Sequence, residues 1–233
     1  MCGRFALATP PEALRQFVDF SNRMNFPARY NIAPTQPVSI IRAEPEQKMA
    51  LVSWGLVPPW LKPAQVEDKS SRPQINARAE TITEKPSFKN AFRRRRCLIP
   101  ADAIYEWDRS IGQPYRIHRQ DEAPFFMAGI WEIWTGADGS EIESCAIITT
   151  AANDRLSAVH HRMPALIAPH QAADWLHVAE TQAESLLPLL GDGLQSEMTA
   201  TPISKRVNKV SEDDMALWEE HRIPPPAKQM DLF

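Results

Sequence analysis

Proline is the residue that most constrains how this chain can fold. The 233 residues include 21 prolines but only 8 glycines, and the prolines are spread along the whole sequence. Each proline holds φ near about −65° and lacks a backbone N–H, so it ends or kinks a helix and does not fit in the middle of a sheet. We therefore expect many short elements joined by rigid turns.

Apolar and β-branched runs between the prolines predict more strands than helices. Most of these runs lie close together in the sequence, which favours a largely antiparallel sheet, closed or folded over itself, rather than alternating strands and helices. The strands are expected at residues 38–42, 49–54, 115–118, 125–131, 145–150 and 165–168, with a turn at 44–46.

The helices are expected to be short. Thr9 with Glu12, and Thr181 with Glu184, have the spacing of a capping box at a helix start. The run Arg93–Arg96 is interpreted as a solvated last helical turn, because cations are favoured at the C-terminal end of the helix dipole. The helices are expected near residues 9–18, 87–94, 171–176 and 184–189.

Composition places the chain among globular proteins, with 43% hydrophobic residues and room for one large or two small domains. The three cysteines and six histidines show no zinc-ligand spacing, so we expect no metal and no cofactor. No apolar run resembles a signal peptide or a membrane span, which predicts a cytoplasmic protein without a membrane partner. Residues 223–228 are rich in proline and are expected to form an extended linker.

Charge is divided unevenly along the chain. Residues 1–100 hold 16 Lys and Arg against 8 Asp and Glu, whereas residues 101–233 hold 10 against 21. The first part therefore carries +8 and the second −11, which together give the net charge of −3. A basic surface built from the first hundred residues could attract phosphates.

Cys2 follows the initiator methionine and becomes the N-terminal residue if Met1 is removed. It would then carry an amine and a thiol that can form an imine with an aldehyde and close a thiazolidine ring. Both groups titrate near neutral pH, with reference pKa values of about 7.7–8.0 and about 8.5. On position alone, the simpler interpretation is a small residue after a start codon.

Three further residues lie in polar islands between apolar or aromatic neighbours: Asn76, Glu106 and His160. They could bind a substrate oxygen, act as a carboxyl group with a raised pKa, and transfer protons near neutral pH. Each also has an ordinary interpretation, as a turn residue, an arginine partner or a core histidine.

Arginines accompany the islands at Arg4, Arg78 and Arg162, a placement that suits an anionic backbone crossing the site. The segment 54–61 contains Trp54 and Trp60, which could stack on a splayed base or belong to the core.

Seven motifs together resemble the SOS response-associated peptidase (SRAP) family, in its order and spacing over about residues 1–210. Such a resemblance implies a single α+β domain, here residues 1–222, with a barrel-like sheet, short peripheral helices and a tail at 223–233. The motifs are MCGRF at 1–5, RYNIAPTQ at 29–36, WGLVPPW at 54–60, INARAET at 75–81, CLIPADAIYEW at 97–107, FMAGIWE at 126–132 and HHRMPALI at 160–167.

The resemblance also implies a function: shielding of abasic sites in single-stranded DNA through a covalent thiazolidine crosslink to the processed cysteine. AP-lyase and self-processing peptidase side activities are implied as well. By matching motif, Cys2 would be the nucleophile, Asn76 would hold the cysteine backbone or sugar oxygens, Glu106 would be a general acid/base and His160 would assist opening of the sugar ring. The DNA-binding residues would be Arg4, Trp60, Arg78 and Arg162.

Two positions depart from the family pattern. His161 stands where an acidic residue is common, and loss of that carboxylate is expected to lower the pKa of His160. Leu61 stands where an aromatic residue is frequent, which leaves Trp60 as the wedge candidate.

The last five residues resemble the short peptide by which bacterial replication and repair proteins bind the β sliding clamp; an ordinary unstructured terminus is the alternative. Two rival functions also remain: an amide hydrolase that uses an N-terminal cysteine, and a reversible reader of single-stranded or modified DNA. The clamp peptide would consist of Gln229, Met230, Asp231, Leu232 and Phe233.

Overall fold

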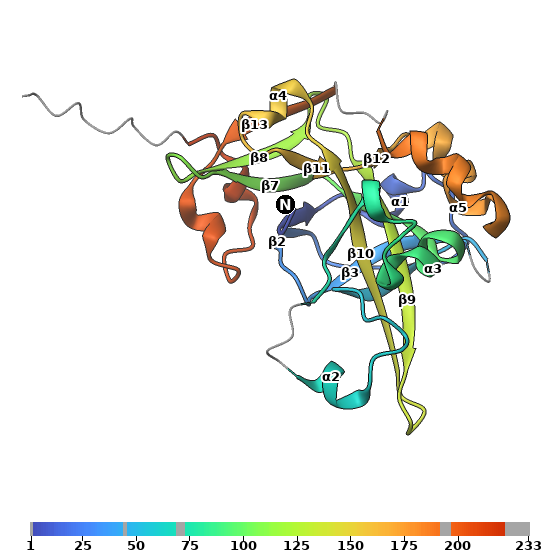
Figure 1. Cartoon of the computed structure of the whole chain (residues 1–233). Helices are drawn as coiled ribbons and strands as arrows, with labels where there is room; N and C mark the ends of the chain where they lie inside the picture. The colour runs from blue at the N-terminus through green and yellow to red at the C-terminus, as the bar shows by residue number, and fades with distance from the viewer. Residues whose placement is uncertain (1, 44–45, 69–72, 192–196, 222–233) are drawn as a thin grey trace, which may run out of the picture.

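Five strands of the structure close into a barrel (Figure 1). The computed structural model describes residues 2–43, 46–68, 73–191 and 197–221. The ring closes between β9 (Phe125–Thr135) and β10 (Glu141–Ala151), because these two long strands pair with each other over seven residue positions. In order around the barrel the strands are β10 (Glu141–Ala151), β4 (Lys48–Trp54), β3 (Pro37–Arg42), β6 (Arg96–Ala101) and β9 (Phe125–Thr135).

A second, open sheet lies beside the barrel, and the chain enters it directly from β6 through Asp102. Phe5 from this sheet packs edge-on against Trp54 of the barrel, with ring centroids 5.1 Å apart, so the two sheets share one core. The open sheet consists of β13 (Met198–Pro202), β8 (Gln113–Arg119), β7 (Ala103–Asp108), β1 (Phe5–Leu7) and β2 (Arg29–Ile32), in that order.

Three short strands extend the barrel sheet at its edges: β5 (Asn76–Arg78), β11 (Arg162–Pro164) and β12 (Leu166–Ile167). Both β5 and β11 pair with β10, and Thr149 of β10 lies opposite Arg78 on one side and Pro164 on the other. The β5–β10 and β4–β10 pairings are parallel, and every other strand pairing of the described residues is antiparallel. The predicted largely antiparallel, barrel-like sheet is confirmed.

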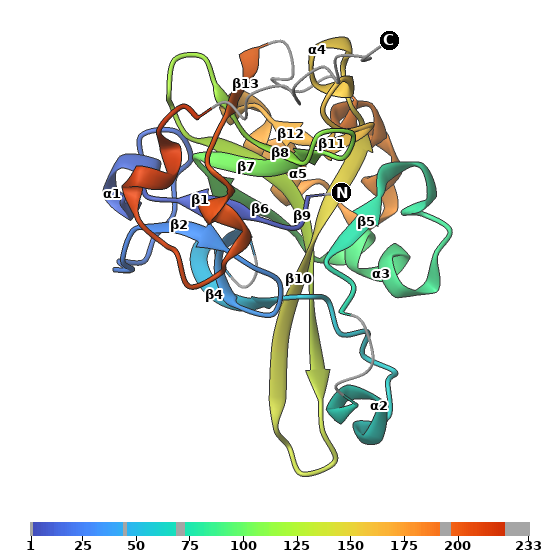
Figure 2. The ribbon, with the colours of Figure 1, turned by 90° about the vertical axis from the view of Figure 1, so that its left-hand side faces the viewer.

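Short helices cover the periphery, and prolines set where many of them begin (Figure 2). Proline occupies one of the first helical positions in three of the α-helices, where its missing N–H costs nothing. The α-helices are α1 (Pro11–Leu14), α2 (Pro63–Glu67), α3 (Pro86–Arg94), α4 (Asp154–Ser157) and α5 (Ala172–His177). The 3₁₀ segments are η1 (Ala79–Thr81), η2 (Pro169–Gln171), η3 (Glu180–Leu190), η5 (Lys205–Asn208) and η6 (Met215–Trp218).

Both predicted capping boxes are wrong. The hydroxyl of Thr9 donates to the carboxylate of Asp102 at 2.5 Å, and α1 starts after Pro10 without a side-chain cap. Residues 184–189 lie within η3, a 3₁₀ segment that begins after Ala179, again without a side-chain cap. In both places a tertiary contact or a tighter helix type replaces the expected local hydrogen bonds.

Together the described residues form one α+β domain. Within them, no helix is both long and apolar enough to cross a membrane. Residues 44–45 of the predicted turn and residues 222–233, which include the predicted tether and terminal peptide, lie outside the described residues.

Candidate functional site

Pairing of the N-terminal strand with β7 places Cys2 in the interior. Phe5 lies opposite Ile104, and the N–H of Tyr105 donates to the carbonyl of Arg4 at 2.9 Å, which carries the pairing one step toward the N-terminus. Cys2 itself is fully buried. Burial, and then the charge of the Glu106 carboxylate, raise the pKa of the Cys2 thiol well above its usual range.

Asn76 at the start of β5 contacts Cys2 directly. Its amide Nδ2 donates to the carbonyl oxygen of Cys2 at 2.8 Å, across 74 residues of sequence. The parallel pairing of Asn76 with Ile147 holds β5 in this position. Oδ1 of Asn76 is buried and has no hydrogen-bond partner among the described residues. Within the described part of the chain, the Asn76 side chain therefore offers a free hydrogen-bond acceptor beside Cys2.

Glu106 lies on β7 and only 4% of its surface is exposed. Burial raises the pKa of its carboxyl group, while the positive charge of Arg109 acts in the opposite direction. The electrostatic effect of Glu106 on the Cys2 thiol shows that the two groups are close enough to influence each other. A raised pKa brings a carboxyl group closer to the range in which it can act as a general acid.

His160 follows α4 and is held by the backbone. Its N–H donates to the carbonyl of Leu156 at 2.9 Å, and ring Nδ1 lies 3.1 Å from both the amide nitrogen and the carbonyl oxygen of Arg162. Burial lowers the pKa of His160, and the neighbouring charges of His161 and Arg109 lower it further. The rings of His160 and His161 stack with centroids 4.4 Å apart. Burial is the largest cause of the lowered pKa, and the effect of His161 in place of an acidic residue stays a prediction.

Two of the predicted phosphate-binding arginines bind other parts of the protein. Arg4 donates to Oδ1 of Asn31 at 2.7 Å and to the carbonyl of Val207 at 2.8 Å. Arg162 donates to both carboxylate oxygens of Glu80, at 2.5 and 3.0 Å, and to the carbonyl of Thr149 at 2.6 Å. These contacts fix both guanidinium groups, so contact with DNA stays a prediction for Arg4 and Arg162.

Arg78 and Trp60 lie in different parts of the surface. Arg78 is exposed at the end of β5, two residues from Asn76. Trp60 is half exposed and lies in the segment before α2. This segment is attached to the β9–β10 hairpin by a hydrogen bond of 2.8 Å, which Trp134 Nε1 donates to the Leu61 carbonyl. Figures 1 and 2 both show α2 away from the N-terminal end. Trp60 lies three residues before α2, so its contact with DNA stays a prediction, and Trp54 is a core residue.

Arg109 is a candidate site residue that the sequence interpretation did not name. It is exposed after β7, and its charge acts on both Glu106 and His160. Its position three residues after Glu106, at a turn between two strands, was the available signal. No group of three or more His, Cys, Asp or Glu within the described residues is arranged to hold a metal ion.

The chain matches the family model described as SOS response associated peptidase (SRAP) over residues 1–210. It is 35% identical to "Abasic site processing protein YoqW" of Bacillus subtilis over 95% of this chain and 100% of that protein. It is 30% identical to "Abasic site processing protein YedK" of Escherichia coli, over 90% of this chain and 95% of the relative.

Solved structures agree with the sequence matches. A crystal structure of a protein from Bacteroides thetaiotaomicron superposes with a TM-score of 0.78 and 26% identity, covering 95% of this chain and 100% of that one. One from Bordetella bronchiseptica gives a TM-score of 0.74 and 29% identity, over 87% of this chain and 100% of the other. The fold, the motif order and the extent of these matches establish that this chain belongs to the SRAP family.

Proposed function

We propose that this protein processes abasic sites in single-stranded DNA by forming a covalent thiazolidine crosslink through Cys2, after removal of Met1. The observation that carries the proposal is the hydrogen bond from Asn76 Nδ2 to the Cys2 carbonyl, 2.8 Å, which holds Cys2 near the Glu106 carboxyl group. The names of the relatives, abasic site processing proteins, point to the same class of substrate.

The chemistry would proceed in two steps. The free α-amine of Cys2 attacks the C1′ aldehyde of the ring-opened sugar, and the carbinolamine loses water to give an imine. The thiol then adds across the carbon–nitrogen double bond, forming the carbon–sulfur bond and leaving a proton on nitrogen. No oxidant or cofactor is needed for this balance.

Glu106 and His160 suit the proton transfers. Burial that raises the pKa of Glu106 favours its protonated form, which could donate a proton to the departing hydroxyl group. Protonation would also remove the negative charge that raises the pKa of the Cys2 thiol. His160, whose pKa is lowered by burial, would be a neutral base that assists sugar-ring opening. Oδ1 of Asn76, which has no hydrogen-bond partner among the described residues, could accept from a sugar hydroxyl.

DNA binding would use the basic residues near the cluster. Arg78 is the exposed candidate for a phosphate contact, and Arg109 adds a positive charge beside Glu106 and His160. Arg4 and Arg162 would contribute if a phosphate takes the place of their present partners. Trp60 would act only on DNA that reaches the α2 side of the molecule.

Two side activities belong to the same proposal. If the imine forms and the thiol does not close the ring, β-elimination could cleave the strand, which is AP-lyase chemistry. Self-processing peptidase activity would cleave the peptide bond between Met1 and Cys2. The β-clamp contact through residues 229–233 remains part of the proposal and concerns a segment outside the described residues.

Cys2→Ser tests the division of labour between amine and thiol. The variant keeps the α-amine, so borohydride should trap an imine with single-stranded DNA that contains one abasic site. Without borohydride, it should form much less denaturant-resistant adduct than the wild type on a denaturing gel. Equal amounts of stable adduct would refute the thiazolidine. An adduct formed with an amide substrate would instead support the N-terminal-cysteine hydrolase, and reversible binding alone would support a DNA reader.

A further inference from the structure

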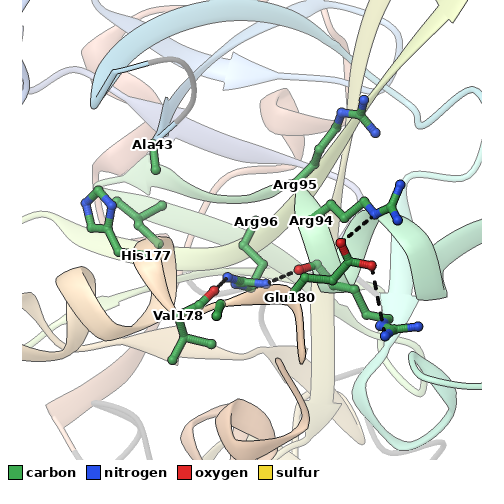
Figure 3. A pocket seen from close by; sticks show the side chains of 10 residues that line it. Ala43, Arg94, Arg95, Arg96, His177, Val178 and Glu180 are labelled. Carbon is green, nitrogen blue, oxygen red and sulfur yellow. Dashed lines mark hydrogen bonds and ion pairs between the residues drawn. The ribbon is translucent and has the colours of Figure 1, made fainter. Parts of the chain in front are cut away.

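Helix α3 connects the neighbourhood of Cys2 with a second pocket. At its start, Lys85 and Ser87 line a pocket of about 350 Å³ together with Asn76, the residue that holds Cys2. At its end, residues 93–96 line a pocket of about 440 Å³ (Figure 3). The helix is nine residues long, which corresponds to about 14 Å at 1.5 Å per residue.

One face of this helix is strongly basic. Residues 85–96 contain six Lys and Arg and no Asp or Glu. Lys85, Lys89 and Arg93 are spaced by four residues, so they follow one another along one side of the helix, and all three are exposed. The opposite side, with Phe88 and Phe92, is buried against the core. The charges therefore form a line from the Asn76 pocket to the second pocket.

The four consecutive arginines diverge because α3 ends at Arg94 and β6 begins at Arg96. Arg96 is buried, in contrast to the solvated turn expected from the sequence. It donates to the carbonyls of Phe92 (2.8 Å) and Arg93 (2.7 Å) at the end of α3, and to that of Trp175 (2.7 Å) near the end of α5, with a further short bond to Val178. Arg96 thus holds the two walls of the pocket together and satisfies helix-end carbonyls.

Arg93 and Arg94 remain at the mouth of the pocket, with side chains 49% and 60% exposed. Glu180 is the one acidic residue that lines the pocket in the described part of the chain, and its carboxylate lies 2.9 Å from Arg94 and 3.9 Å from Arg93. Figure 3 shows this carboxylate reaching between the guanidinium groups. Such exposed ion pairs are weak and can exchange for another anion.

We propose that the basic face of α3 and its arginine pocket bind the phosphate backbone of the DNA strand that leaves the abasic site. The inference rests on the proposed function. A line of charge that starts beside Asn76 fits a polyanion better than a single small anion, which the pocket alone could hold. At about 3.4 Å per nucleotide, the spacing along one strand of duplex DNA, the length of α3 corresponds to about four stacked nucleotides, and to fewer if the strand is extended. A phosphate would replace the Glu180 carboxylate between Arg93 and Arg94.

The test compares reversible binding of short and long single-stranded oligonucleotides that carry one abasic site, extended on the 5′ side, the 3′ side or both, in a Cys2→Ala background. The charge-removing variant is Lys89→Gln/Arg93→Gln/Arg94→Gln. Its matched control, Lys89→Arg/Arg93→Lys/Arg94→Lys, keeps the charge at the same positions. Extension on one side should strengthen binding to Cys2→Ala alone and to the control, but not to the charge-removing variant.

The salt dependence of DNA binding gives the expected size of the effect of the charge-removing variant. With about 0.7 counterions released per phosphate contact, three lost contacts should make the salt slope shallower by about 2. Between about 50 and 200 mM salt, the parent protein should therefore lose about 20-fold more affinity for long DNA than the charge-removing variant. Glu180→Gln should tighten long-DNA binding relative to Glu184→Gln, a matched change in the same 3₁₀ segment.

An unchanged length advantage and salt slope in the charge-removing variant would overturn the inference, as would a Glu180→Gln protein that binds no tighter than Glu184→Gln. Loss of binding to inorganic phosphate without any change in long-DNA binding would assign the pocket to small anions and also overturn it. Crosslinking of the wild type to the short oligonucleotide tests the proposed function separately, because that DNA does not reach the arginine pocket.

Discussion

Replacing Asn76 by alanine tests the contact on which the site geometry depends. The substitution removes the Nδ2 donor 2.8 Å from the Cys2 carbonyl and leaves that carbonyl without this partner. An unsatisfied buried polar group costs about 1–3 kcal/mol. If that cost falls on the arrangement in which Cys2 reacts, crosslinking should slow by about 5- to 160-fold, since each 1.36 kcal/mol is a factor of ten.

The assay is the single-turnover rate of crosslinking to single-stranded DNA with one abasic site, read on denaturing gels. Asn22→Ala is the matched control, because Asn22 Nδ2 also donates to a backbone carbonyl, that of Met49, at 2.9 Å. Both variants should lose stability, and only Asn76→Ala should lose rate. A folded Asn76→Ala protein that crosslinks at the wild-type rate would refute the reasoning, and so would an equal loss of rate in Asn22→Ala.

Four other predictions follow from the remaining contacts and motifs. Burial raises the pKa of Glu106, so the folded state holds this proton more tightly than the unfolded chain does. The wild type should therefore lose stability as pH rises from about 4.3 to the raised pKa. Glu106→Gln should remove this loss in urea titrations, and an unchanged pH dependence of stability would contradict the prediction. His161→Asp should raise the pKa of His160 through the stacked contact at 4.4 Å, as measured by NMR titration, whereas an identical titration would show that His161 is inconsequential. Arg96→Met should lower the free energy of unfolding by about 3 kcal/mol or more, because buried carbonyls lose a charged donor; a loss below about 1 kcal/mol in urea denaturation would be inconsistent with this role. Deletion of residues 229–233 should abolish pull-down by the β sliding clamp, and undiminished pull-down would remove that hypothesis.

The strands that could be predicted from the sequence are those with continuous apolar or β-branched runs. Residues 38–42, 49–54 and 125–131 fall within β3, β4 and β9. The strands within Arg96–Asp108 were not predicted, because Pro100 interrupts the apolar run of β6. Pro100 nevertheless lies opposite Phe126 of β9. A proline normally argues against a strand paired on both sides. The pairing of β6 with β3 is at Cys97 and Leu98 and does not reach Pro100, which lies opposite β9.

Tertiary contacts explain the local errors. Asp102 accepts hydrogen bonds from Thr9 across 93 residues of sequence, which removes Thr9 from the cap of α1. Arg96 turns inward because two helix ends present carbonyls to it, a partner set that local sequence does not reveal. Strand β5 has only three residues, too few for a periodic pattern, and it exists through its pairing with β10.

The motifs identified the candidate site residues, but the sequence could not predict which residues each of them contacts. The resemblance named Cys2, Asn76, Glu106 and His160, and the structure shows that Asn76 contacts Cys2 and that Glu106 acts on its thiol. Motif matching could not show that Arg4 and Arg162 have protein partners, because these depend on side-chain direction. It could not find Arg109 either, whose influence on Glu106 and His160 depends on the β7–β8 turn.

The central claim is that Cys2 reacts as a free N-terminal residue through both its amine and its thiol. Intact mass spectrometry of the Met1-processed protein mixed with single-stranded DNA containing one abasic site tests it most directly. We expect one adduct that is stable without reductant and has the summed mass of protein and DNA minus one water. No such adduct should form with Cys2→Ala or with protein whose α-amine is blocked. The same adduct from amine-blocked protein, or none from the processed wild type, would contradict it.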